Sequence, residues 1–280
     1  NMILKIKKKN IPLVLLNARI TKKSFKKWRK ILSFSKKIFN EFDLCLAQND
    51  KTCNYLKILG AKNIRKIGNL KFSQSKLELK NKSNPRIKKF LINKKIMFSA
   101  ISTHAGEELL CGKVHSNLKK KYKNIISIII PRHIHRAHEI KEELNSTGLK
   151  VHLHSSNRPM NKDTDIYLVD TFGETKAFLR LSKTAFMGKS IHAFGGQNPL
   201  EAARLGNRII HGPNIENFVE VYDFLKKHGI SSKINSYNDL KNLVVKFERK
   251  KNYSQQIIKK LTYTGNQILI NNEKEINKYF

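Results

Sequence analysis

IISIIIP, at Ile125–Pro131, is the longest apolar run of the chain. A membrane-spanning helix needs about 18 apolar residues, so this run has the length of a strand instead. Strands that are apolar at almost every position are typical of parallel sheets covered by helices on both faces. The polar stretch RHIHRAHEI follows at once, at 132–140. The run therefore predicts a buried parallel strand whose carboxyl end meets polar residues, which is where open α/β sheets bind ligands.

Shorter runs of the same kind alternate with longer amphipathic segments along the whole chain. We predict strands at 11–18, 43–48, 96–102, 125–131, 150–155, 165–170, 184–188 and 207–212. This alternation indicates βα units, and hence an α/β protein with Rossmann-like domains. A polar stretch at 77–91, which contains Ser-Asn-Pro, separates two series of such units. We therefore expect a first domain at 1–77, a linker at 78–93, a second domain at 94–252 and closing helices at 253–280.

The chain is strongly basic: 56 Lys and Arg against 21 Asp and Glu give a formal net charge of +35 over 280 residues. This charge suits a nucleic-acid-binding protein, a protein at an anionic membrane surface, or an enzyme of acidic substrates. Lys, Asn and Ile are abundant throughout, so a compositional bias explains part of the charge without any function. The 3 cysteines are odd in number and have no Cys-x-x-Cys spacing. They indicate neither a disulfide framework nor a zinc site, and they fit a reducing cytoplasm.

A glycine-rich stretch, GGQNPLEAARLG at 195–206, follows the predicted strand TAFMG and the segment KSIHAF. Glycines before a helix let backbone N–H groups approach an anion closely, and the helix dipole stabilises that charge. Glu201 lies three residues after Asn198, so both side chains project from the first turn and can flank one ligand. A carboxylate is suited to accept hydrogen bonds from a ribose diol. The alternative is a glycine turn capped by Asn198, with Glu201 as an ordinary first-turn acid.

Other predicted strands also end in glycine turns and polar side chains. ISTHAGEELL at 101–110 places Ser102, Thr103 and His104 before a helix that opens with two glutamates. Arg132 and His133 follow the strand at 125–131, and VDTFGET at 169–175 carries Glu174. Because the carboxyl ends of parallel strands meet at one edge, we expect these side chains to converge on one ligand. Turn and cap preferences explain any one of these stretches, but they explain the whole set poorly.

Several motifs together resemble the 3-deoxy-D-manno-octulosonic acid (Kdo) transferases of lipopolysaccharide synthesis. They are IPLVLLNARIT at 11–21, GNLKF at 68–72, STHAGEE at 102–108, PRH at 131–133, DTFGE at 170–174 and GGQNPLEAA at 195–203. The chain departs from the family pattern at Gln197, where His is usual, and at Ala202, where Pro is frequent. Both replacements keep hydrogen-bonding or helical capacity, which indicates a divergent member.

The resemblance implies a GT-B glycosyltransferase with two Rossmann-like domains, the first of them incomplete. Such enzymes transfer Kdo from CMP-Kdo to a lipid A precursor, lipid IVA, with inversion and without a metal or another cofactor. The resemblance also implies a peripheral protein on the cytoplasmic face of the bacterial inner membrane, with no transmembrane segment within residues 1–280. It places the general-base glutamate of the family upstream of Asn1, so the chain is expected to be truncated at its N-terminus. If the base lies within the chain instead, Glu107, Glu108 or Glu174 would supply it.

The resemblance and the residue chemistry together give two sets of expected contacts. The donor set is Ser102, Thr103, His104, Arg132, His133, Glu174, Gly188, Ser190, Gly195, Gly196, Asn198 and Glu201. Within it, Arg132 offers a bidentate fork for the phosphate, and Gly195 and Gly196 offer backbone amides to an anion. Asn198 and Glu201 are assigned to hydroxyls of the ribose or of Kdo. The acceptor set is Asn17, Arg19 and Thr21, at the end of the first strand.

Three further features have more than one interpretation. His152 and His154 share a strand face, but no further ligands can be named, so we predict no metal site. The run at 21–42 predicts a basic amphipathic helix with Phe25, Trp28 and Phe39 on its apolar stripe, which either lies on anionic lipid or faces a core. The closing segment predicts amphipathic helices that return to the first domain.

Two other functions stay open at this stage. A different GT-B enzyme that uses a UDP-sugar also places glycines and a glutamate before a ribose-binding helix. A basic nucleic-acid-binding protein would carry aromatic-studded basic strands or a recognition motif, and the sequence contains neither. We therefore expect no nucleic-acid partner, and we expect CMP-Kdo, a lipid A precursor and an anionic membrane surface as partners.

Overall fold

The computed structural model describes residues 2–73, 94–249 and 255–279. It divides into two compact units, Asn1–Lys76 with Lys259–Phe280, and Leu77–Ile258. Both units are built on parallel β-sheets with helices between the strands, which confirms the predicted α/β class. The predicted linker at 78–93 lies outside the described residues.

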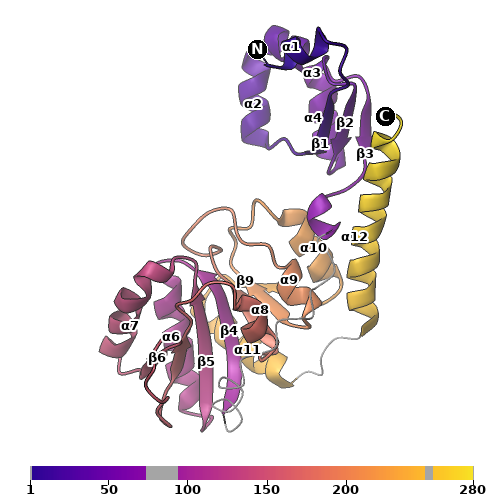
Figure 1. The fold of residues 1–280 in the computed structure, drawn as a ribbon. Helices are drawn as coiled ribbons and strands as arrows, with labels where there is room; N and C mark the ends of the chain where they lie inside the picture. The colour runs from indigo at the N-terminus through magenta and orange to yellow at the C-terminus, as the bar shows by residue number, and fades with distance from the viewer. Residues whose placement is uncertain (1, 74–93, 250–254, 280) are drawn as a thin grey trace. The chain divides into compact units, whose positions relative to one another are not determined.

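The first unit contains a parallel sheet of order β1-β2-β3, formed by Val14–Ala18, Leu44–Ala47 and Ile64–Lys66 (Figure 1). Its helices are α1 (Met2–Lys7), α2 (Lys22–Lys30), α3 (Leu32–Phe39), α4 (Asp50–Leu59) and the 3-10 turn η1 (Leu70–Ser73). Thr21 caps α2 and Asn49 caps α4, each by accepting a backbone N–H in the first turn. Gly60 ends α4 at φ +104°, a conformation that glycine adopts without strain.

The predicted single helix at 21–42 is wrong, because the chain leaves the helical region at Ile31 (φ −119°, ψ 48°) and forms α2 and α3 instead. The apolar stripe of this run belongs to the core of the first unit. The ring of Phe25 stacks on that of Tyr55 with centroids 4.0 Å apart, and Trp28 meets Phe39 edge-on at 5.3 Å. Of the two interpretations of the stripe, the structure therefore supports core packing.

The long helix α12 (Gln255–Ile276) carries the last part of the first unit (Figure 1). Beyond its end, the Tyr279 hydroxyl donates to the Asp43 carbonyl at 3.0 Å and lies 2.6 Å from Asn63 Nδ2. Gly265 approaches η1 so closely that an added Cβ would stand 1.9 Å from the Phe72 carbonyl oxygen. The helix is therefore fastened to residues far away in the sequence.

The second unit is built on a seven-stranded parallel sheet of order β10-β9-β8-β4-β5-β7-β6. The strands are β4 (Lys95–Thr103), β5 (Ile125–Pro131), β6 (Val151–Leu153), β7 (Ile166–Leu168), β8 (Thr184–Met187), β9 (Arg208–His211) and β10 (Ser231–Lys233). The helices are α6 (Glu107–Lys119), α7 (Ala137–Ser146), α8 (Thr175–Leu179), α9 (Leu200–Arg204), α10 (Val219–Lys227) and α11 (Tyr237–Arg249), with the 3-10 turn η2 (Ile134–Arg136).

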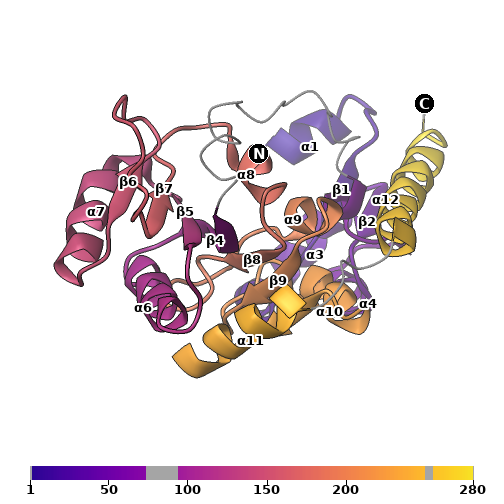
Figure 2. The ribbon, with the colours of Figure 1, turned by 90° about the horizontal axis from the view of Figure 1, so that it is seen from below.

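Helices cover the sheet of the second unit on both sides. Figure 2 shows α6 and α11 on one side of the strands, and α8 and α9 on the other. A large apolar cluster joins β4, β5 and β7 to α6, α7 and α11, and it includes Phe98, Ile129, Leu144 and Phe247. Every residue of β5 is buried, as expected for a central strand of such a sheet. None of the helices in the described ranges combines the length and the apolar character needed to span a bilayer.

Candidate functional site

The order of the seven strands defines where a ligand would bind. From β4 the chain moves to β5, then to β6 at the edge and back to β7 between them, whereas β8, β9 and β10 are added on the other side of β4. The direction of winding therefore reverses between β4 and β8. Ligands of open parallel sheets bind at this kind of reversal, outside the carboxyl ends of the strands. The loops after β4, β5, β7 and β8 meet here, and they contain most of the predicted donor set.

The side chain of Glu107 ties the loop after β4 to the loop after β8. Its Oε2 accepts N–H groups from His104 (2.9 Å) and Lys189 (2.8 Å), and its Oε1 accepts those of Ser190 and Ile191 (both 3.0 Å). Glu107 is completely buried. Lys189 has φ +57°, so the backbone here curves into a concave group of N–H donors of the type that binds anions. The carboxylate of the chain itself occupies this concavity.

The ends of β4 and β8 lie in unusually close contact. A Cβ on Gly188 would stand 2.4 Å from the Ser102 carbonyl oxygen and 2.6 Å from Thr103 Cα, so only glycine fits. Ser102 itself has φ +53°, a left-handed conformation that is costly for a non-glycine residue. Gly188 therefore serves backbone packing, and Ser102 is held at the crevice in a strained conformation.

A group of cationic and imidazole side chains gathers on the loops after β4 and β5. Arg132 is exposed, and its guanidinium has no ion pair within the described part of the chain. The ring of His133 lies 5.6 Å from that of His104 and 5.6 Å from that of His135. Partial loss of water and the nearby charges of His104 and His135 lower the pKa of His133. The sequence interpretation missed His135, although the His-x-His spacing of 133–135 was its available signal.

Glu174 lies at the carboxyl end of β7 and is held by a hydrogen-bonded histidine. His154 Nε2 lies 2.7 Å from Glu174 Oε2, and Thr171 donates its hydroxyl to the same oxygen. Glu174 precedes α8, but its side chain makes no capping hydrogen bond there. The side chain of Glu174 therefore does not cap α8. Its other oxygen, Oε1, has no hydrogen-bond partner in residues 2–73, 94–249 and 255–279.

The glycine loop after β8 differs from the predicted anion cradle. Gly195 N–H donates to Glu216 Oε2 at 2.8 Å, and Gly196 N–H donates to the Lys189 carbonyl at 3.1 Å. Both amides are therefore engaged inside the chain. An added Cβ on Gly196 (φ +67°) would meet Ile215 Cα at 3.0 Å, so a larger residue would strain the fold itself. The expected role of these two amides as anion donors is corrected: the glycines allow close packing of the loop.

The residues that follow this loop have mixed roles. Asn198 Oδ1 accepts the N–H of Leu200 at 3.1 Å, which matches the alternative of a capped turn. The helix it caps, α9, is only 5 residues long, so its dipole is weak. Glu201 is partly exposed and lies 3.3 Å from Lys176 Nζ, which joins α9 to α8. Among the described residues, the Nδ2 of Asn198 has no hydrogen-bond partner, and the carboxylate of Glu201 is partly exposed.

Two expected donor contacts are buried inside the unit. The Ser190 hydroxyl donates to the Met187 carbonyl at 2.6 Å and accepts the N–H of Gly212 at 2.8 Å. Ser190 and Thr103 are both completely buried. Their hydroxyls therefore cannot touch a ligand in this conformation, and both assignments are corrected to structural roles. Exposed and buried positions alternate at the end of a strand, and this alternation could have indicated that one of these residues is buried. We followed the motif match instead.

Glu107 and Glu108 are poor candidates for a general base. Glu107 uses both oxygens for the four N–H groups described above, and Glu108 is also completely buried. Burial raises the pKa of Glu108, although Arg136 lies 3.3 Å from its Oε1 and favours the charged form. A base must reach the proton that it removes, and neither carboxylate reaches the surface of the crevice.

The expected acceptor set lies at the end of β1 in the first unit, where two of its members already have structural partners. Asn17, at φ +52°, accepts N–H groups of Gln48 (2.9 Å) and Leu70 (3.1 Å) through Oδ1. The Thr21 hydroxyl accepts the N–H of Ser24 as the cap of α2. Arg19 is exposed. Asn17 and Thr21 therefore shape the strand end, and Arg19 lies at the surface beside them.

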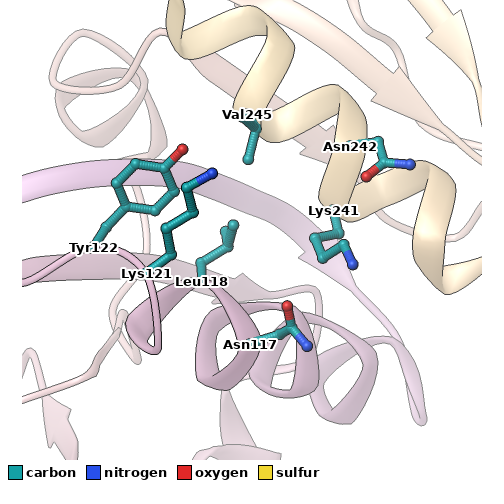
Figure 3. Close-up of a pocket in the computed structure, with 7 residues that line it drawn as sticks. All are labelled: Asn117, Leu118, Lys121, Tyr122, Lys241, Asn242 and Val245. Carbon is teal, nitrogen blue, oxygen red and sulfur yellow. The ribbon is translucent and has the colours of Figure 1, made fainter.

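Two other features of the second unit bear on the location of the site. Within the described residues, no group of three or more His, Cys, Asp or Glu side chains has the arrangement of a metal site. A pocket of about 290 Å³ lies between the end of α6 and α11, lined by Asn117, Leu118, Lys121, Tyr122, Lys241, Asn242 and Val245 (Figure 3). The end of α6 precedes β5, so this pocket is at the amino edge of the sheet. It contains no member of the predicted donor set.

Two units built on parallel sheets, the second with a reversal of winding between β4 and β8, define the GT-B class of glycosyltransferase fold. The chain superposes on an α,α-trehalose-phosphate synthase (UDP-forming) from Burkholderia vietnamiensis with a TM-score of 0.58, at 9% identity, over 99% of this chain and 68% of that one. It also superposes on the C-terminal CMP-Kdo binding domain of WaaA from Acinetobacter baumannii, with a TM-score of 0.54 and 23% identity, over 64% of this chain and 91% of that one.

Sequence comparison identifies the family. The family model for 3-deoxy-D-manno-octulosonic-acid transferase matches residues 1–74. The 3-deoxy-D-manno-octulosonic acid transferase of Rickettsia bellii is 31% identical over 236 residues, which are 84% of this chain and 56% of that protein. The chain belongs to the 3-deoxy-D-manno-octulosonic acid transferase family, as the motifs predicted. It spans about half the length of the curated relatives that it matches.

Proposed function

We propose that this chain carries the CMP-Kdo site of an inverting, metal-independent transferase that moves Kdo to a lipid A precursor, lipid IVA, in lipopolysaccharide synthesis. Family membership supports the transfer of Kdo, and the likeness of the second unit to a domain described as CMP-Kdo binding supports the donor. The acceptor, the inversion, the independence from metals and other cofactors, and the location at the cytoplasmic face of the inner membrane are part of this proposal.

One observation carries the proposal: an exposed guanidinium beside three imidazoles at the winding reversal of the sheet. Arg132 follows β5, and the rings of His104, His133 and His135 stand in sequence at centroid distances of 5.6 Å. CMP-Kdo carries a phosphate and a sugar carboxylate, which both need cationic partners. Arg132 can bind either anion bidentately, and neutral or charged imidazoles can donate to the other.

The same group would stabilise charge that develops during transfer. In an inverting reaction the acceptor oxygen bonds to the anomeric carbon of Kdo, while the bond from that carbon to the phosphate oxygen breaks. CMP departs with the bonding electron pair, and the acceptor hydroxyl loses its proton to a base. Cationic groups fixed in advance around the departing phosphate lower the barrier, because they need no reorganisation as its charge grows.

The carboxylates of the crevice divide between structure and hydroxyl binding in this proposal. Glu107 and Glu108 are buried, and Glu174 is held by His154 and Thr171. We assign Glu174 and Glu201 to hydroxyls of the ribose or of Kdo, with Ser102 and the Nδ2 of Asn198 beside them. We place the general base outside the described carboxylates of the crevice. Arg19 is the side chain that we assign to a phosphate of the acceptor.

Calorimetric titration of the full chain with CMP and with UDP tests the donor. We expect CMP to bind more tightly than UDP, which would also dismiss the rival use of a UDP-sugar. Arg132→Lys should weaken CMP binding at least about tenfold, because an ammonium does not reproduce the planar fork. The exposed Arg29 of α2 supplies a matched control, and Arg29→Lys should leave binding unchanged. Tighter binding of UDP, or equal losses for CMP and phosphate-free cytidine in Arg132→Lys, would contradict the proposal.

A further inference from the structure

Tyr167, His154 and Glu174 form a continuous hydrogen-bonded chain at the carboxyl end of β6 and β7. The Tyr167 hydroxyl lies 2.8 Å from His154 Nδ1, and His154 Nε2 lies 2.7 Å from Glu174 Oε2. Tyr167 belongs to β7, His154 follows β6, and Glu174 precedes α8. Three separate elements are therefore joined through one imidazole.

The chemistry of the partners fixes the direction of this chain. A carboxylate only accepts hydrogen bonds, so the Nε2 of His154 must carry the proton that faces Glu174. In a neutral imidazole Nδ1 is then an acceptor, and the Tyr167 hydroxyl must donate to it. Burial, followed by the charges of Glu174 and Asp170, raises the pKa of Tyr167 to about 12. Tyr167 therefore keeps the proton that this arrangement requires.

The surroundings allow the imidazole little freedom to rotate. The side chain of His154 is 11% exposed, and its ring contacts those of Tyr167 and Phe178 at centroid distances of 5.7 and 5.4 Å. A second link, from Ser155 to Asp170, joins the same two loops through a backbone N–H at 2.8 Å and a hydroxyl. The position of Glu174 is therefore set by packed aromatic rings and by two independent loop contacts.

The arrangement leaves one oxygen of Glu174 available. Both internal donors, His154 and Thr171, bond Oε2, and Oε1 has no partner within the described ranges. The carboxylate is 32% exposed. Glu174 follows β7, which pairs with β5, and Arg132 comes directly after β5. An oriented carboxylate oxygen that faces solvent beside a cationic group is suited to accept a hydroxyl of a ligand whose phosphate or carboxylate meets the cations.

We propose that Tyr167 and His154 are positioning residues, which hold Glu174 so that its Oε1 accepts a hydroxyl of the bound nucleotide sugar. This inference rests on the proposed function for the ligand, but the chain of hydrogen bonds exists without it. The hydroxyl belongs either to the ribose or to the transferred sugar. Both are sugar hydroxyls that can donate to a carboxylate. Measuring the binding of CMP and of CMP-Kdo in parallel distinguishes them, because CMP contains only the ribose.

A double-mutant cycle in ligand binding tests the inference. Tyr167→Phe removes only the hydroxyl that donates to His154 and should weaken binding about 3- to 10-fold, and Glu174→Gln should weaken it more. In the Glu174→Gln background, Tyr167→Phe should change binding less than about twofold, because the oriented acceptor is already lost. Losses for CMP and CMP-Kdo alike assign the ribose, and losses for CMP-Kdo alone assign Kdo. Additive losses, or unchanged binding in both single variants, would overturn the inference.

His152→Ala is the matched control, since the His152 ring also contacts Tyr167, at 5.5 Å, without a hydrogen bond to Glu174 among the described residues. It should leave binding unchanged. A measurement without ligand separates this inference from the proposed function: ¹⁵N NMR of the imidazoles should find His154 protonated at Nε2 alone, and Glu174→Gln should weaken that preference, because an amide can also donate to Nε2. Protonation at Nδ1 in the unsubstituted chain would overturn the positioning role, whereas failure to bind either nucleotide with the expected tautomer intact would overturn the proposed ligand.

Discussion

At the scale of single residues, Glu107 holds the most demanding position in the second unit. Its carboxylate is completely buried and accepts four backbone N–H groups from two loops, at 2.8 to 3.0 Å. Three of these donors are consecutive, at 189–191. A neutral or shorter side chain would leave several buried N–H groups without an acceptor, which costs about 1–3 kcal/mol for each group.

Glu107→Gln should therefore lower the free energy of unfolding by about 2–4 kcal/mol, because the amide turns its own N–H groups toward two backbone donors. Urea denaturation of the full chain measures the change. Glu108→Gln is the matched control, because Glu108 is as deeply buried as Glu107. Burial raises the pKa of Glu108 and so favours its neutral form, which glutamine resembles. A Glu107→Gln variant as stable as Glu108→Gln would show that the carboxylate does not fasten the loops.

The sequence located this crevice but assigned several of its residues to the wrong task. Strand ends and motifs brought Arg132, His133, His104 and Glu174 to one edge, because the carboxyl ends of parallel strands always converge. The motifs could not reveal that Ser190 is buried or that Gly195 donates to Glu216, because these contacts join residues about 20 positions apart or more. Residue type and spacing indicate which groups lie near the site. Only tertiary contacts show which of these groups already have a hydrogen-bond partner within the chain.

At the scale of elements, a buried polar network joins α6 to β5 and β7. Asp165 Oδ1 lies 2.6 Å from Lys119 Nζ and 3.4 Å from His115 Nε2, and His115 Nδ1 lies 2.9 Å from the Ser127 hydroxyl. Burial alone would raise the pKa of Asp165, but hydrogen bonds from His115, Lys119 and the Lys150 N–H hold it well below its usual range. The network therefore stabilises the fold only while Asp165 is charged.

This network predicts an acid-sensitive contribution to stability. The folded-state pKa of Asp165 is depressed, so its contribution is complete above the unfolded value of about 3.9 and is lost as the pH falls below it. Between pH 7 and pH 3, the free energy of unfolding should fall by about 1 kcal/mol more in the unsubstituted chain than in Asp165→Asn. Parallel denaturation curves at the two pH values measure this difference. An equal fall in both chains would contradict the assignment.

The contact between α12 and η1 gives a second prediction at the scale of elements. It concerns a change in stability whose sign is opposite to the one that helix propensity alone predicts. Alanine is about 1 kcal/mol more favourable than glycine inside a helix. At Gly265, however, an added Cβ would stand 1.9 Å from the Phe72 carbonyl oxygen. Gly265→Ala should therefore destabilise the chain by about 1–3 kcal/mol, and Asn266→Ala, at an exposed position of the same helix, should not. Thermal denaturation of both variants measures these changes. A Gly265→Ala chain that is more stable than the unsubstituted chain would show that α12 is free to shift.

The elements themselves were predicted best where burial dominates. The strand predicted at 125–131 matches β5, whose seven residues are all buried. The short strands β3 (Ile64–Lys66) and β10 (Ser231–Lys233) were missed, because three residues of mostly polar character leave no pattern in a sequence. Helix α1 was missed as well, and the run at 21–42 was assigned to one helix because its apolar spacing continues through the break at Ile31.

At the scale of the whole molecule, the net charge of +35 suggests that the protein binds to an anionic membrane surface. Phe25 and Trp28 of α2 pack into a core, so the helix offers its lysines rather than its apolar stripe to a membrane. Each surface lysine near anionic lipid gives about 1 kcal/mol, and this attraction decays within a Debye length of about 10 Å at 0.1 M salt.

Vesicles that contain anionic lipid should recruit the full chain, and added salt should release it. Replacement of Lys22, Lys23, Lys26 and Lys27 by glutamine should weaken recruitment more than the same change at the exposed Lys226, Lys227, Lys259 and Lys260. The two variants have equal net charge, so the comparison isolates position. Sedimentation with vesicles measures the bound fraction. Equal losses would assign the charge to a diffuse compositional bias and would remove the membrane-facing role of α2.

The whole proposed activity depends on nucleotide binding at the carboxyl edge of the seven-stranded sheet. Backbone amide NMR of the full chain during titration with CMP tests it most directly. We expect shift changes concentrated in the loops after β4, β5, β7 and β8, at 102–108, 132–136, 170–176 and 188–201. Shift changes confined to the pocket between α6 and α11, around Tyr122 and Lys241, or no shift changes at all, would contradict it.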